Sequence, residues 1–321
     1  MARPDPLESA RPPIYEISGT ISQPPFLLRW PGYAVVAPDF QGLGIDHTIT
    51  DSGETTFLRS PWVAHVPIAN DMFHAQRAAL QAFPSQLSDE FVVMGHSQGG
   101  GVAWAAAERQ AVRPVPGYLG TISGSPASNY SSVIDYFGLE IVQAALIAWS
   151  AQSIFPEFEL SEVLTPLGMS RLALLAEVNG CQMTRGTLLG VDIDELILDD
   201  WAENFYIRQF LELTGAGGKP VAGPMIVIQS TTDPLIPEVT VTQTVNETCM
   251  RHPESLIDYL VVNGTAHVPT LSATQKHWLG WISDRFAGVP VEDGCRGIVL
   301  QPYLPTEHYQ YDNNYFLERE T

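Results

Sequence analysis

Positively charged residues are scarce in this chain, and their scarcity limits what it can bind. The 321 residues include 16 Lys and Arg against 36 Asp and Glu, giving a formal net charge of −20, and the pI is near 4.6. Lysine occurs only at Lys219 and Lys276. Because nucleic acids and anionic membrane surfaces repel a net anion, the composition argues against both as partners. We expect neutral or apolar small molecules as ligands.

Long apolar runs are also missing, and we expect no targeting segment in this sequence. No stretch approaches the roughly 20 apolar residues that span a bilayer, and the nearest run, 141–149, directly follows Glu140. The first residues lack the apolar core of a signal peptide. Acceptor sequences for N-glycosylation nevertheless occur at Asn129, Asn246 and Asn263, as in secreted proteins.

Cysteines and metal-binding patterns are few. With three cysteines, one is left over after any single pairing. The glycines at 99–101 follow a serine and lack the lysine of a phosphate-binding loop. An acidic run comprises Asp192, Asp194, Glu195, Asp199 and Asp200. We interpret this run as a solvated helix face rather than a metal site, and we predict neither a metal nor a cofactor.

The apolar content is sufficient for a substantial core. With 45% hydrophobic and 10% aromatic residues, the chain is predicted to form one large globular domain, or a domain with an insertion. Strand and helix patterns alternate in its first part: strands at 33–38, 91–95 and 117–123, and helices at 68–83 and 99–110. This alternation predicts an α/β fold with a mostly parallel sheet flanked by helices.

The alternation stops between about 124 and 223. Helical patterns at 132–149, 162–179 and 193–214 follow one another without a strand, which indicates an inserted helical cap or lid. Strand patterns then return at 225–229 and 256–262. One helix pattern lies between these strands and ends at about residue 250, and another covers 270–286. We therefore divide the chain into a first core part (1–123), the cap (124–223), a second core part (224–287) and an irregular C-terminal tail (288–321).

The sequence Gly95-His-Ser97-Gln-Gly99 joins an apolar strand pattern to a helix pattern. A sharp strand-to-helix turn of this kind holds its serine in a strained, exposed position. Gly95 and Gly99 are expected to keep side chains out of the crowded turn. Ser97 is therefore a candidate nucleophile.

A serine nucleophile needs a base, and the base needs an acid that holds the correct tautomer. Asp233 and His267 each follow a predicted strand, in the chain order Ser, Asp, His. Either residue alone could be structural, because most Asp-Pro pairs are simple turns, but both lie where the acid and base are needed. The backbone N–H of Gln98, next to the nucleophile, is the predicted oxyanion donor. Among the other histidines, His96 is treated as the variable residue of the turn.

A family resemblance follows from the segments 32–42, 95–99, 233–237, 264–267 and 281–286. Over about residues 30–298 the chain resembles the secretory lipase family of fungi, the lipase A type. The resemblance implies an α/β-hydrolase fold, a Ser97, Asp233 and His267 triad, a lid within the cap and a Cys249–Cys295 disulfide. It also implies a secreted protein that hydrolyses acylglycerols or other esters, with no cofactor, at a lipid–water interface.

The chain departs from this family at its front. Family members carry several strands before the one that matches 33–38, including a loop with the second oxyanion donor and a cysteine that bridges to the cap. Residues 1–32 show no such pattern, so we expect the N-terminal strands to be missing and Cys181 to be unpaired. The expected function is a serine carboxylester hydrolase, in particular a lipase. The alternatives are an acyltransferase of the same fold or a catalytically impaired, truncated homologue.

Overall fold

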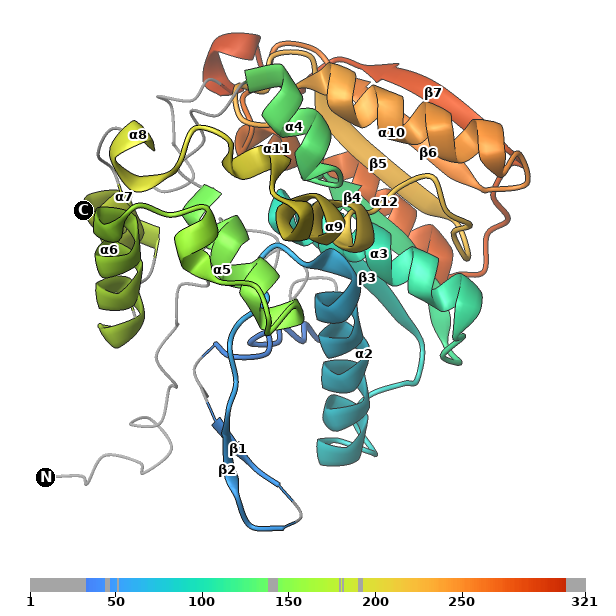
Figure 1. Cartoon of the computed structure of the whole chain (residues 1–321). Coiled ribbons are helices and arrows are strands. Elements are labelled where there is room, and N and C mark those ends of the chain that lie inside the picture. Colours follow the sequence, from blue (N-terminus) through green and yellow to red (C-terminus); the bar gives the residue numbers. More distant parts are fainter. Residues whose placement is uncertain are drawn as a thin grey trace, which may run out of the picture.

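The computed structural model describes residues 33–43, 47–50, 52–137, 144–178, 180, 182–189 and 193–309. Within them a five-stranded parallel sheet has the order β3-β4-β5-β6-β7 (Figure 1). Its strands are β3 (Phe91–His96), β4 (Tyr118–Gly124), β5 (Met225–Ser230), β6 (Ile257–Val262) and β7 (Cys295–Leu300). A separate antiparallel hairpin consists of β1 (His47–Ile49) and β2 (Thr55–Phe57), in a region where no strand was predicted.

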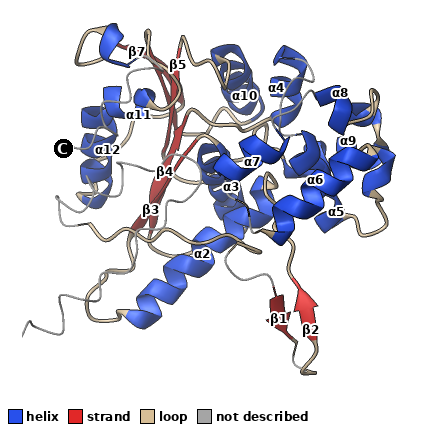
Figure 2. Ribbon diagram, turned by 90° about the vertical axis from the view of Figure 1, so that its left-hand side faces the viewer, coloured by secondary structure: helices blue, strands red, loops and turns tan. Residues whose placement is uncertain are grey.

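Helices cover both faces of the sheet (Figure 2). One face carries α2 (His65–Ala82), α3 (Gln98–Val112) and α10 (Glu238–Arg251), and the other carries α11 (Pro269–Ala273) and α12 (Gln275–Phe286). Side chains of β5 alternate between the two cores: Met225 and Val227 pack on the α3 side, while Ile226 and Ile228 pack with Trp278 of α12. Because both faces are buried, the strand reads as a continuous apolar run, which is why it was predictable.

The described residues between β4 and β5 form helices and no strand, apart from one isolated antiparallel bridge between Leu164 and Ile197. The helices are α4 (Tyr130–Phe137), α5 (Ala144–Ile154), α6 (Pro166–Glu177), α7 (Gln182–Leu189), α8 (Ile193–Leu196) and α9 (Phe205–Thr214), with short 3-10 turns at Leu160–Glu162 and Trp201–Glu203. None of the described helices is long and apolar enough to cross a membrane.

Two of the helices predicted in this region are divided. The pattern over 193–214 breaks at Asn204, whose side-chain oxygen accepts a hydrogen bond from the N–H of Tyr206 at 2.9 Å and so caps α9. The pattern over 132–149 yields α4 and α5, and residues 138–143 between them lie outside the described part. The apolar side of α5 is buried in the larger core cluster, in which Ile147 packs with Ile207 and Phe210 of α9.

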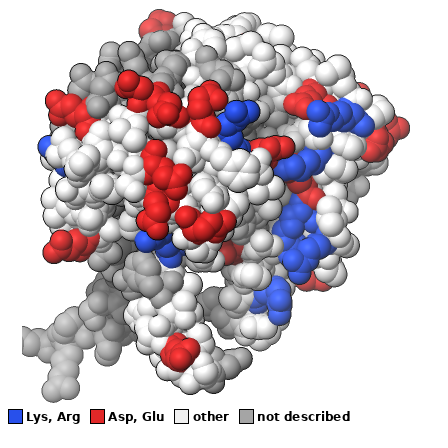
Figure 3. Space-filling model, viewed as in Figure 1, with Lys and Arg blue, Asp and Glu red and all other residues white. Residues whose placement is uncertain are grey.

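Acidic side chains gather over the cap helices, at the left of Figure 3, while most Lys and Arg side chains in that view lie at the right. Glu195, Asp199 and Asp200 are exposed. Part of the acidic run is therefore solvated, as predicted; Asp192 lies outside the described residues.

The segment 33–38 corrects one prediction. It was expected to be a buried parallel strand, but it is an irregular segment in which Val35 and Val36 are 37% and 43% exposed. Tyr33 stacks on Phe286 of α12, with ring centroids 5.0 Å apart. No described strand pairs with the segment, so the strand propensity of its valines is not accompanied by strand hydrogen bonds within the described part of the chain.

The C-terminal part corrects another. Residues 288–321 were expected to be irregular, yet β7 pairs in parallel with β6 and forms the sheet edge. Arg296 on β7 donates two hydrogen bonds of 2.7 Å to the carboxylate of Asp258 on β6. The Cys249–Cys295 disulfide that the resemblance implied is present and ties α10 to the start of β7. Cys181 lies outside the described residues.

Candidate active site

The turn between β3 and α3 holds Ser97 in an unusual conformation. Its backbone angles are φ 59° and ψ −121°, a region that residues other than glycine rarely adopt. The N–H of Ser97 donates to the carbonyl oxygen of Gly124 at 2.9 Å, and its own carbonyl accepts from Ala127 at 3.0 Å. The end of β4 therefore fixes the strained turn, and the predicted sharp strand-to-helix turn is present.

The glycines of the turn differ in their roles. A Cβ on Gly95 would lie 1.9 Å from the carbonyl oxygen of Gly99, and one on Gly100 would lie 2.6 Å from that of Gly124. A Cβ on Gly99 would meet nothing within 4 Å. The prediction of a crowded position is thus confirmed for Gly95 and wrong for Gly99, because the strand packs against the helix backbone while Gly99 faces open space.

Asp233 lies in the loop after β5, and its carboxylate organises that loop. One carboxylate oxygen accepts hydrogen bonds from the backbone N–H groups of Leu235 and Ile236, each at 2.9 Å. The side-chain amide of Gln229 donates to the carbonyl of Ile236 at 2.6 Å. These bonds fix the orientation of the carboxylate and leave its second oxygen to bind another group.

That second oxygen lies 2.7 Å from Nδ1 of His267, in the loop after β6. Both side chains are buried. Burial raises the pKa of the Asp233 carboxyl, but hydrogen bonds from His267, Ile236 and Leu235 outweigh burial and leave the pKa below its ordinary value. An ionised Asp233 keeps the proton of His267 on Nδ1, so that Nε2 can act as a base.

The structure brings this pair to the elbow. The ring of His267 lies against that of His96, the residue before Ser97, with centroids 4.6 Å apart. All three predicted residues follow the carboxyl ends of strands: Ser97 follows β3, Asp233 follows β5 and His267 follows β6. Parallel sheets gather functional side chains at these strand ends.

Gln98 is the first residue of α3, so its backbone N–H has no partner within the helix. Its side-chain amide donates to the carbonyl oxygen of Trp62, which ties the start of α3 to the loop before α2. The second oxyanion donor, which members of the lipase A type carry in a loop before the segment that matches 33–38, was expected to be missing, and residues 1–32 lie outside the described part.

Supporting residues were missed by the sequence analysis. Gln229 and Ser230 end the apolar run of β5, and both side chains bond the loops that carry Asp233 and His267. Two polar residues that close a buried strand are a signal that could have indicated them. His96, taken as variable, contacts His267 directly.

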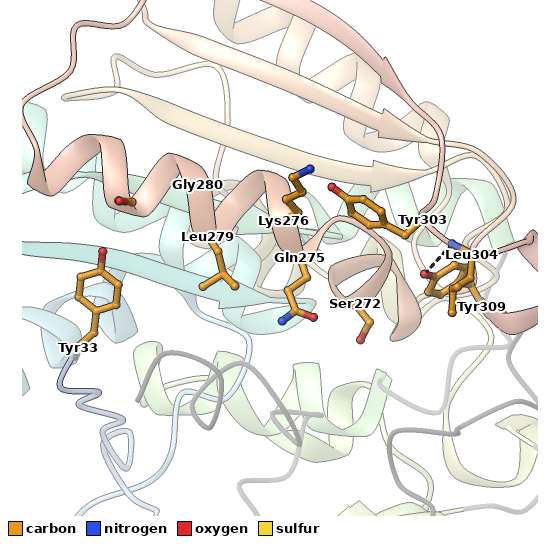
Figure 4. A pocket seen from close by; sticks show the side chains of 10 residues that line it. Tyr33, Ser272, Gln275, Lys276, Leu279, Gly280, Tyr303, Leu304 and Tyr309 are labelled. Carbon is orange, nitrogen blue, oxygen red and sulfur yellow. Dashed lines mark hydrogen bonds between the residues drawn. The ribbon is translucent and has the colours of Figure 1, made fainter. Parts of the chain in front are cut away.

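A hollow of about 870 Å³ lies along α12 (Figure 4). It is lined by Tyr33, Ser272, Gln275, Lys276, Leu279, Gly280, Ser283, Tyr303, Leu304 and Tyr309. Since none of the three predicted catalytic residues lines it, we assign it no part in their chemistry.

Known structures share this fold. Lipase A from Candida antarctica superposes with a TM-score of 0.64 at 14% identity, covering 83% of this chain and 67% of that one. A protein from Legionella pneumophila gives 0.65 at 15% identity, with 82% and 72% covered. The cell-wall-degrading esterase LipA from Xanthomonas oryzae gives 0.53 at 16%, with 73% and 67% covered. At these identities the likeness shows the fold alone.

Sequence comparison gives the family. No curated protein is significantly similar to this chain in sequence. A sequence model of the Alpha/beta hydrolase family, however, matches residues 18–276, a range that includes the elbow and both loops with Asp233 and His267. The chain therefore belongs to the alpha/beta hydrolase family.

Proposed function

We propose that the protein is a serine carboxylester hydrolase in which Ser97 is the nucleophile, His267 the general base and Asp233 the orienting acid. The buried 2.7 Å hydrogen bond between Asp233 and His267, beside the strained turn of Ser97, carries the proposal. An isolated structural histidine would not require a turn with such backbone angles next to it.

The first half of the reaction forms an acyl-enzyme. The Ser97 hydroxyl oxygen attacks the ester carbonyl carbon while Nε2 of His267 takes the hydroxyl proton. The carbonyl oxygen becomes an oxyanion and accepts a hydrogen bond from the Gln98 N–H, at the positive end of α3. The C–O bond to the alcohol then breaks, and His267 returns the proton to the leaving alkoxide.

The second half releases the acid. A water molecule attacks the acyl carbon, His267 takes its proton, and the resulting tetrahedral oxyanion collapses to break the bond to Ser97. Ser97 regains its proton from His267, so all proton transfers in the cycle take place between Ser97, His267, the leaving alcohol and water. Asp233 stays ionised throughout and stabilises the imidazolium that forms twice.

The proposed substrates are acyl esters of small alcohols or lipids. The resemblance to fungal lipases of the A type, and the esterase and lipase among proteins of the same fold, support this class. Secretion and N-glycosylation are part of the proposal and rest on the sequence alone.

Labelling with a fluorophosphonate and turnover of p-nitrophenyl esters test the proposal. We expect the probe to modify Ser97, and Ser97→Ala to lose on the order of 10⁶ in kcat. Ser283→Ala is the matched control, because Ser283 is exposed on α12. Labelling of a different serine, or turnover that survives Ser97→Ala, would refute the assignment.

Analysis of products in the presence of an added alcohol separates hydrolysis from acyl transfer. We expect free acid as the main product. If a new ester formed instead at low alcohol concentration, the protein would be an acyltransferase that uses the same acyl-enzyme.

A further inference from the structure

His96 ends β3 and immediately precedes Ser97. Its side chain is buried, with 6% of the residue exposed, and its Nε2 lies 3.0 Å from the backbone carbonyl oxygen of His267. The two imidazole rings also touch, with centroids 4.6 Å apart and planes at 47°. One side chain thus contacts both the backbone and the ring of the proposed base.

The protonation of His96 follows from these contacts. A carbonyl oxygen can only accept a hydrogen bond, so Nε2 of His96 must carry the proton and donate it. Burial, and the nearby His267, lower the pKa of His96 to about 3, so the ring remains neutral. Its Nδ1 is buried without a partner among the described residues. A neutral ring places no positive charge beside His267 when His267 becomes an imidazolium.

The His96 bond differs in kind from the other bonds to the His267 loop. Asp233 holds the His267 ring through Nδ1, and it comes from the loop after β5. The N–H of Ala266 donates to the carbonyl of Tyr309 at 2.7 Å, which anchors the loop to the C-terminal part. Neither bond involves the turn that carries the proposed nucleophile Ser97, whereas His96 is the residue directly before Ser97 in the chain.

We propose that His96 is a positioning residue that sets the distance between nucleophile and base by bonding the backbone of His267 to the turn that carries Ser97. This inference rests on the proposed function. Geometry at this distance controls the rate, because a misplacement of about 1 Å can cost on the order of 100-fold.

Two variants of similar size separate the hydrogen bond from the ring. His96→Gln keeps an N–H donor at comparable reach, and His96→Met removes the donor while filling similar space. We expect His96→Met to have a kcat about 10 to 100-fold below that of His96→Gln, with KM within about twofold, because only positioning is lost. His74→Met, on the exposed side of α2, is the control and should leave both parameters unchanged.

A second readout does not depend on turnover. The proton on Nδ1 of His267, bonded to Asp233, should give a low-field proton NMR signal that stays sharp in His96→Gln and broadens in His96→Met. If the wild-type protein hydrolysed no ester, the proposed function would fail, and this signal would still decide the inference. If His96→Met does not fold, His96→Phe replaces it. Equal kcat and equal signals in the donor and non-donor variants would overturn the inference.

Discussion

The hydroxyl of Ser230 accepts a hydrogen bond from the backbone N–H of Thr265 at 3.1 Å and donates one to the carbonyl oxygen of the same residue. Ser230 ends β5 and Thr265 follows β6, and both are fully buried. Thr232 also donates to the Thr265 carbonyl, at 3.1 Å. These bonds join the loop that carries Asp233 to the loop that carries His267.

Ser230→Ala should therefore loosen the hydrogen-bonded pair of Asp233 and His267. The substitution leaves the buried Thr265 N–H without its partner, which costs about 1–3 kcal/mol of unfolding free energy. We also expect kcat for ester hydrolysis to fall about tenfold, because the loops that carry Asp233 and His267 would no longer be held at a fixed distance from each other. Thermal unfolding and steady-state kinetics measure the two effects, and Ser283→Ala, on an exposed site, is the control. Unchanged stability and rate would show that the bridge is dispensable.

Asp233→Asn should abolish most activity while preserving the loop. An asparagine oxygen can still accept the hydrogen bonds from Leu235 and Ile236, but its amide would donate to Nδ1 of His267. The histidine proton would then lie on Nε2. A protonated Nε2 cannot accept the hydroxyl proton of Ser97. We expect a loss on the order of 10⁴ in kcat with an unchanged circular dichroism spectrum. Asp199→Asn, on the exposed cap surface, is the control; a loss of only a few-fold would assign the orienting role elsewhere.

The elements around the site were predictable because their signals are local. The elbow at Ser97 needs only a strand, a turn with Gly95 and a helix, and these lie within some twenty residues. β5 and β6 are buried on both faces or nearly so, which gives apolar runs that can be recognised without knowing their neighbours. The loops after them then place Asp233 and His267 at one edge of the sheet.

The errors come from features that only tertiary contacts decide. β7 is half exposed, and its Val299 is 70% exposed, so neither an apolar run nor a clean alternation marks it as a strand. The segment 33–38 has the opposite problem, since its valines favour a strand while no described strand bonds to it. The predicted helix 270–286 divides at Thr274, whose hydroxyl bonds the carbonyl of Thr270 at 2.9 Å. The contact of His96 with His267 spans 171 residues and leaves no trace in either local sequence.

Glu108 links stability to pH. It lies on α3, is 5% exposed, and accepts a hydrogen bond of 2.6 Å from the N–H of Gly217 at the end of the cap. Lys219 lies 3.4 Å from its other oxygen. Burial raises the pKa of Glu108 from 4.5 to about 7, although Lys219 and Gly217 act in the opposite direction.

Because the folded state binds this proton more tightly than the unfolded state, stability should fall as pH rises from about 4.5 to 7. Glu108→Gln mimics the protonated form, so it should equal the wild type near pH 4.5 and exceed it above pH 7 by up to about 3 kcal/mol. Urea denaturation across this pH range measures the difference. The stability difference between Glu247→Gln, which removes an exposed pair with Arg251, and the wild type should not change with pH over this range. A parallel pH dependence of Glu108→Gln and wild type would contradict the prediction.

The Cys249–Cys295 disulfide closes a loop with a sequence separation of 46 residues and joins α10 to the edge strand β7. Its loss removes a constraint on the unfolded chain, so a Cys249→Ala, Cys295→Ala double variant should lose about 2–5 kcal/mol, or roughly 3–7 °C in melting temperature. Cys295 begins β7, whereas the loops with Asp233 and His267 follow the opposite, carboxyl ends of the strands. The folded variant should therefore keep its kcat at low temperature. Met250→Ala, beside Cys249 and 77% exposed, is the control. A large fall in kcat at low temperature would show that the disulfide also affects the proposed site.

Non-reducing peptide mapping tests the pairing itself. It should recover the cross-linked peptides of Cys249 and Cys295 from the wild type, and a bridge from Cys181 to either cysteine would refute the pairing.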